Sequence, residues 1–170
     1  MVYDVIVIGA GPSGSILAYL LAVEGLSVLI LEKEPLPRYK VCGGGLTYKA
    51  INKIPFPIQP VIEREALGGI VSYKGNILLK VNVEQPFAAL VMRDRFDFYL
   101  AQNAIEAGAC LREGVTVTGL SQETDWVVAQ TSDGDYFGKL LVGADGVNSI
   151  VARSAGFLIH RNWELPLKLK

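Results

Sequence analysis

Two short apolar runs near the amino terminus are separated by a longer apolar stretch. Residues 5–8 and 27–32 are rich in β-branched and aliphatic side chains, as are strands that are buried on both faces of a parallel sheet. The stretch between them ends at Gly25, a residue type that commonly stops a helix. The pattern predicts a strand, a helix and a second parallel strand.

Two strand-length apolar stretches appear in the middle of the chain. Residues 69–73 and 77–83 are apolar stretches of strand length with polar interruptions, within a proline-punctuated segment that covers residues 55–92. This pattern predicts a β-hairpin. We interpret residues 55–92 as an insertion between two parts of a larger sheet.

Helical spacing resumes after the hairpin. In residues 93–108 the apolar side chains recur on one face, before Gly108 as the stop; they are Phe96, Leu100, Ala104 and Ala107. Further strands are then predicted: a parallel strand at 115–117, a hairpin of 126–131 and 135–141 around the turn 132–134, and a strand at 141–143.

Composition and charge narrow the classes of function. The 170 residues are 51% hydrophobic, which fits a folded domain with a sizeable core. The net charge is −1 without any basic block, so we expect no nucleic-acid partner. Two cysteines and one histidine are too few for a disulfide framework or a metal cluster. We therefore expect a cytoplasmic protein without a metal.

The apolar amino terminus has the composition of an export signal but not its layout. It lacks a basic first region, and Asp4, Glu24 and several glycines interrupt what would have to be one continuous apolar helix. We expect this segment neither to direct export nor to span a membrane.

A glycine motif follows the first predicted strand directly. Residues 9–14 are GAGPSG, a G-x-G-x-x-G motif in the strand, turn and helix context that dinucleotide sites use. In such a motif Gly9 permits the tight turn, Gly11 lets a diphosphate approach the backbone, and Gly14 allows close packing of helix on strand. The alternative is a glycine-rich turn without a ligand.

Residues beside this motif extend the candidate site. Pro12 suits the first helical turn, and Ser13 follows it at the helix end that attracts anions. Glu32 ends the second strand, where a carboxylate can accept hydrogen bonds from the hydroxyl groups of an adenosine ribose. Lys33 is a further candidate contact, although a solvated surface charge is the simpler interpretation.

A second glycine cluster follows Cys42 in the stretch RYKVCGGGLT. Gly43, Gly44 and Gly45 indicate either positive φ angles or a planar ligand against the main chain, and the alternative is a mobile turn. Thr47 is placed to cap a helix that begins after it.

These motifs in combination resemble a known superfamily. GAGPSG with Glu32, PRYKVCGGGLT, the RDRFD helix and GADGVNSIVAR are similar to the flavoproteins typified by p-hydroxybenzoate hydroxylase. Within that superfamily, the cysteine–glycine segment most resembles the geranylgeranyl reductase family. The resemblance covers roughly residues 1–156.

The resemblance implies an α/β fold. We expect a Rossmann-like FAD-binding domain in three layers, with a mostly parallel sheet and a β-meander, and an inserted β-hairpin from an incomplete substrate domain. The expected divisions are a first FAD-binding segment, an inserted hairpin, a second FAD-binding segment and the start of a substrate-domain segment, at residues 1–54, 55–92, 93–156 and 157–170.

The resemblance also implies roles for individual residues. FAD would lie extended from Glu32, at its adenosine ribose, to the three glycines after Cys42, whose bare amides would meet the flavin ring. Arg93 is expected near the flavin's phosphates or ribityl chain, although an ion pair with Asp97 is the alternative. Further candidate cofactor contacts are Asp145 and Gly146, from a motif that serves both FAD and a nicotinamide cofactor, and Val117.

The implied chemistry is reduction of a carbon–carbon double bond in a prenyl chain, with NAD(P)H as electron donor. Cys42 would assist protonation of the alkene, and its alternative is a small buried hydrophobic residue. The runner-up activity is FAD-dependent hydroxylation of an aromatic or polyene substrate. A prenyl substrate also implies peripheral contact with a membrane, while the sequence leaves the oligomeric state open.

Members of the superfamily are more than twice as long as this chain and carry a later Gly-Asp-Ala motif that completes the flavin pocket. We therefore expect an amino-terminal portion or a truncated relative. A hypothesis of another class is a non-catalytic remnant that only binds nucleotide.

Overall fold

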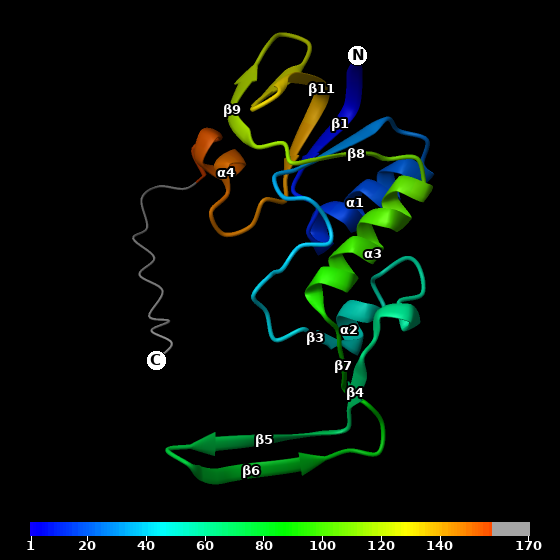
Figure 1. Cartoon of the computed structure of the whole chain (residues 1–170), viewed down its shortest axis with the longest axis vertical. Helices are drawn as coiled ribbons and strands as arrows, with labels where there is room; N and C mark the ends of the chain where they lie inside the picture. The colour runs from blue at the N-terminus through cyan, green and yellow to red at the C-terminus, as the bar shows by residue number, and fades with distance from the viewer. Residues whose placement is uncertain (158–170) are drawn as a thin grey trace.

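The computed structural model describes residues 1–157, so the predicted substrate-domain segment at 157–170 lies, apart from Phe157, outside the described residues. A six-stranded sheet lies in the upper part of the molecule as Figure 1 shows it. The strands, in order across the sheet, are β8 (Cys110–Glu113), β2 (Val28–Glu32), β1 (Val2–Ile8), β11 (Gly134–Gly143), β10 (Val127–Thr131) and β9 (Val117–Gln122). The first four are parallel and the last two form an antiparallel meander, which confirms the predicted fold class.

Alternate residues of the central strands build two separate cores, as the two-residue period of a strand requires. Val5 and Val7 face the helices α1 (Pro12–Val23) and α3 (Arg93–Glu106), which lie side by side on one face of the sheet (Figure 1). Ile6 and Ile8 face the other way, toward side chains of the meander. Side chains of the meander therefore pack over this second face.

A smaller sheet lies beside the start of α3. It contains β3 (Gly45–Thr47), β7 (Ala88–Leu90) and β4 (Arg64–Ala66), with the short helices α2 (Tyr48–Ile51) and η1 (Gln59–Val61) next to it. Its core joins the main body through Phe96 and Leu100 of α3, which pack against Ile58 and Val91. The described chain ends after α4 (Ile150–Ser154).

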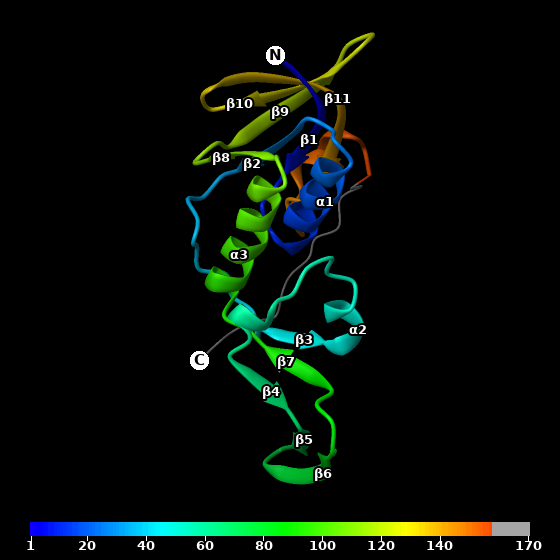
Figure 2. The ribbon, with the colours of Figure 1, turned by 90° about the vertical axis from the view of Figure 1, so that its right-hand side faces the viewer.

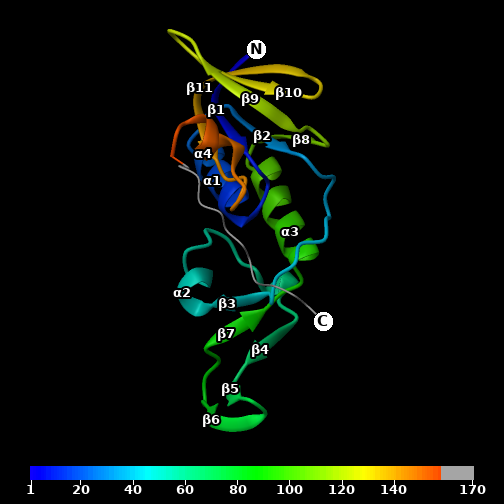
Figure 3. The same ribbon diagram turned by 90° about the vertical axis from the view of Figure 1, so that its left-hand side faces the viewer.

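The predicted hairpin forms β5 (Gly68–Tyr73) and β6 (Asn76–Asn82), a two-stranded sheet of its own. It extends away from the rest of the structure in every view (Figure 2, Figure 3). Almost all of its side chains are exposed, including Leu78 at 66% and Ile77 at 64%. The described body of the protein thus leaves both faces of the hairpin uncovered.

One predicted strand was wrong. Residues 115–117 do not form the next parallel strand; that place belongs to β8, and Val117 instead begins the antiparallel strand β9. Val115 and Val117 are buried, but against the second core. Gly114, at a φ of +71°, makes the turn out of β8. A short apolar alternation indicates burial without saying which neighbour the strand pairs with.

Candidate functional site

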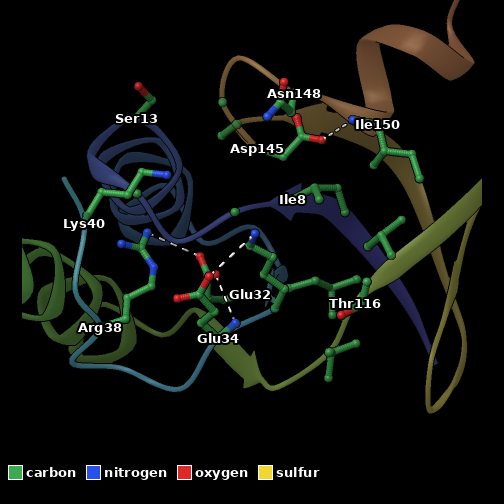
Figure 4. Close-up of a pocket in the computed structure, with 18 of the residues that line it drawn as sticks. Ile8, Ser13, Glu32, Glu34, Arg38, Lys40, Thr116, Asp145, Asn148 and Ile150 are labelled. Carbon is green, nitrogen blue, oxygen red and sulfur yellow. Dashed lines mark hydrogen bonds and ion pairs between the residues drawn. The ribbon is translucent and has the colours of Figure 1, made fainter. Parts of the chain in front are cut away.

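A cavity of about 390 Å³ opens at the carboxyl ends of β1, β2 and β11, in front of the amino end of α1 (Figure 4). Ligands of open α/β sheets bind at such strand ends. Most of the candidate residues line the cavity; they are Gly9, Gly11, Pro12, Ser13, Glu32, Lys33, Arg93, Val117, Asp145 and Gly146. Gly14 and residues 42–45 are not among the lining residues.

The three motif glycines meet three different steric demands. Gly9 has a φ of +101°, and a side chain there would strike the backbone of Ala144. Gly14 faces the carbonyl oxygen of Gly9, so it serves the packing of α1 rather than the cavity itself. Gly11 is the N-cap of α1, lacks any side-chain cap and opens onto the cavity. The first amides of α1 are thus available to an anion.

Glu32 lies inside the cavity wall and is only 4% exposed. One carboxylate oxygen accepts a hydrogen bond from the Ala10 amide at 2.8 Å, and the other accepts one from the Glu34 amide at 3.2 Å. An ionised carboxylate has about four acceptor positions, so acceptor capacity remains for a ribose hydroxyl. Contact of Glu32 with a ribose stays a prediction.

Arg93 forms the ion pair that the sequence left open, and its contact with the flavin stays a prediction. Its Nε and Nη2 donate to the two oxygens of Asp97 at 2.8 and 2.9 Å, as one turn of α3 brings the two residues together. Arg93 also lines the cavity. Asp97, which is fully buried, therefore holds the guanidinium at the cavity's edge.

Sequence reasoning missed Arg38, which lines the cavity and whose side chain is 10% exposed. Its Nη1 donates to Asp97 Oδ2 at 3.0 Å, and its Nη2 lies 3.6 Å from Glu32 (Figure 4). The only sequence feature that pointed to this residue was its place in the loop after Glu32, the acidic end of the second strand. Its spacing from that strand did not distinguish it from the nearby lysines, which we took as surface charges.

Asp145 lies on the side of β1 opposite to Glu32 (Figure 4). Its Oδ2 accepts hydrogen bonds from the amides of Ile150 and Val151 at 2.7 and 3.4 Å, at the start of α4. Its Oδ1 is buried and has no partner among the described residues. A buried polar atom of this kind is rare and costly.

The cysteine–glycine segment lies apart from this cavity. Gly44 has a φ of +67° and faces the carbonyl oxygen of Val91, so the close approach here is to the chain's own backbone. Gly43 and Gly45 border open space, and their flavin contact stays a prediction. Thr47 does cap α2, accepting from the Ala50 amide.

Cys42 is exposed rather than buried, so the alternative of a small core residue was wrong. Its Sγ accepts a hydrogen bond from the Gly44 amide at 3.4 Å. That amide, and next the Arg93 guanidinium, lower the pKa of the Cys42 thiol.

Comparison with known families decides what the cavity belongs to. Residues 2–165 match the sequence profile of the FAD binding domain. The chain belongs to this FAD-binding domain family. The superfamily predicted from the motifs is confirmed, and the cavity has a glycine loop that suits a diphosphate and a carboxylate that suits a ribose.

Relatives of this FAD-binding domain include longer proteins. An uncharacterized protein of Methanosarcina barkeri is 38% identical over 152 residues, and the probable electron transfer flavoprotein-quinone oxidoreductase YdiS of Escherichia coli is 34% identical over 170. These alignments cover 89% and 92% of this chain, but 39% of each relative. The chain thus spans about two fifths of the length of these relatives.

A solved structure shares the arrangement of this FAD-binding domain. It is a geranylgeranyl bacteriochlorophyll reductase-like protein of Thermoplasma acidophilum, with 28% sequence identity and a TM-score of 0.80. The match covers 95% of this chain and 44% of that one.

Proposed function

We propose that this chain forms the FAD site of an oxidoreductase that reduces a carbon–carbon double bond in a prenyl chain, with NAD(P)H as electron donor. The observation that carries the proposal is the cavity, which the glycine loop, Glu32 and Asp145 line together. The prenyl substrate is supported by the cysteine–glycine segment and by the likeness to the geranylgeranyl bacteriochlorophyll reductase-like protein.

The residues of the cavity would hold FAD along its length. Glu32 would accept the hydroxyls of the adenosine ribose, and Gly11 with the first amides of α1 would receive the diphosphate. Asp145 and Arg93 would lie toward the flavin half, and Gly146 and Val117 line the same cavity. Bound FAD supplies the hydride-transfer chemistry that amino-acid side chains lack.

Cys42 would donate a proton to the substrate carbon from its Sγ. The lowered pKa makes this thiol a better acid than an ordinary cysteine. Arg93, which is held by Asp97, would then stabilise the thiolate that remains. The exposure of Cys42 leaves its Sγ open to a substrate that approaches from outside the cavity.

A prenyl substrate would place the protein at a membrane surface, in contact from the cytoplasmic side. None of the helices described in residues 1–157 is long and apolar enough to cross a membrane. We propose that the contact is peripheral.

The test follows the two half-reactions of the protein purified at its natural length and loaded with FAD. In Cys42→Ser, reduction of FAD by NAD(P)H should proceed at the parental rate, because the thiol takes no part in it. Reoxidation by a prenyl substrate should slow by about 10²- to 10⁴-fold, the usual contribution of a positioned acid.

Each other outcome decides against part of the proposal. Unchanged reoxidation in Cys42→Ser removes the thiol from the chemistry. Hydroxylation of an aromatic substrate in the presence of oxygen favours the monooxygenase activity instead. A parental protein that binds adenine nucleotides but is not reduced by NAD(P)H is a nucleotide-binding remnant.

A further inference from the structure

Arg38 belongs to the motif PRYKVCGGGLT, which the sequence analysis quoted without giving this residue a role. Its Nη2 is the nearest neighbour, at 3.9 Å, of the place where a Cβ on Gly11 would lie. Gly11 is the N-cap of α1, so the guanidinium borders the space in front of the helix's first amides. Arg38 and those amides face the same part of the cavity.

Two carboxylates from different elements hold this guanidinium in place. Glu32, at the end of β2, lies 3.6 Å from Nη2, and Asp97, on α3, accepts from Nη1 at 3.0 Å. Both carboxylates are buried, at 4% and 0% exposure. A buried arginine with two such partners loses little freedom when it binds a ligand, because its orientation is already set.

The contacts leave donor groups unused. A guanidinium carries five N–H groups, and the only hydrogen bond that Arg38 makes within the described residues is the one from Nη1 to Asp97. The four charges of Glu32, Asp97, Arg38 and Arg93 cancel, and the first turn of α1 contains no acidic residue. An anion in front of the first turn of α1 therefore meets N–H donors, and these four side chains present it with no net negative charge.

We propose that Arg38 is the side chain that contacts the diphosphate of the bound dinucleotide, and that Asp97 positions it. This inference rests on the proposed FAD site and adds a side-chain contact to the backbone contacts of the glycine motif. Asp97 does not touch the ligand; it acts by orienting Arg38 and Arg93 together.

The test compares ADP with adenosine, which share the base and ribose and differ in the diphosphate. Calorimetric titration of the protein at its natural length, freed of cofactor, should show that Arg38→Gln weakens ADP by about 10- to 100-fold and adenosine by less than about 2-fold. Asp97→Asn should shift the ratio of ADP to adenosine affinity in the same direction. Arg95→Gln is the matched control, since Arg95 lies on α3, is 67% exposed and pairs with Glu63.

The possible outcomes separate this inference from the proposed function. If Arg38→Gln weakens ADP and adenosine equally, Arg38 only shapes the ribose site through Glu32, and the inference is overturned. If the parental protein binds neither ligand, the nucleotide site itself fails. Should Arg38→Gln not fold, Arg38→Lys gives the same comparison, because lysine keeps the positive charge but lacks the planar guanidinium that can donate two parallel hydrogen bonds. If the ratio of ADP to adenosine affinity in Arg38→Lys equals that of the parental protein, the inference is overturned.

Discussion

The carbonyl oxygen of Gly9 fills the space that a side chain on Gly14 would need. The two glycines are the first and last of the motif, so the turn and the helix that follows it are in direct backbone contact. A methyl group at position 14 must push α1 away from the end of β1, and with it the amides that face the cavity.

Gly14→Ala should therefore destabilise the fold. Overpacking of this kind typically costs about 1 to 3 kcal/mol. Chemical denaturation monitored by circular dichroism measures the change. Gly43→Ala is the control, because position 43 borders open space and its φ is not positive; an equal loss in both variants would contradict the assigned contact.

Gly11→Asp should abolish binding of FAD and ADP while leaving the thermal unfolding temperature nearly unchanged. Position 11 has room for a side chain, with Arg38 Nη2 as its nearest neighbour. The new carboxylate would sit at the expected diphosphate position, repel the ligand and pair with Arg38. Fluorescence titration with FAD checks the prediction, and parental affinity in the variant would remove Gly11 from the site.

The Cys42 thiol should titrate below the ordinary cysteine range. Its pKa is lowered by the Gly44 amide and by Arg93, so the reactive thiolate is already more populated at a given pH than in a free thiol. The rate of alkylation by iodoacetamide as a function of pH measures this pKa. Arg93→Gln should raise it. Cys42→Ser supplies the background from Cys110, and an identical profile in Arg93→Gln would show that the guanidinium has no influence.

The β5–β6 hairpin should exchange its amide hydrogens far faster than the central sheet. A two-stranded ribbon with both faces exposed is only marginally stable, and its exposed side chains include Ile70 at 60% and Leu79 at 54%. Hydrogen exchange by mass spectrometry compares this segment with β1 and β2. Equal protection in the two regions would mean that another surface covers the hairpin.

The sequence predicted the parts of the fold that depend on local pattern. Three predicted features depend only on a few neighbouring residues, and each forms as predicted. They are the strand at residues 5–8, the helix face through Phe96 and Leu100, and the hairpin turn at 132–134. The glycine motif was predictable for the same reason, since its spacing encodes a local turn.

Features that depend on long-range packing were not predictable. β8 is short and partly exposed, so Cys110–Glu113 lacks the apolar run that marked β1 and β2. Arg38 gains its place from Asp97, which is 59 residues away. Gly44 was linked to a flat ligand, whereas its tightest neighbour is Val91, the residue that follows β7.

The central pairing of β1 with β11 has a consequence for how the protein is made. Val2 pairs with Phe137 and Ile8 with Gly143, so β1 leaves the ribosome long before β11, with which it pairs. Until β11 has been made, β1 can pair only with β2, and Asp145 cannot lie on the side of β1 opposite to Glu32. Contacts between such distant segments form slowly. The cavity is therefore completed after nearly all of the described chain has been synthesised, and the exposed edge of β1 is the point at which the nascent chain is most open to a chaperone or to wrong pairing.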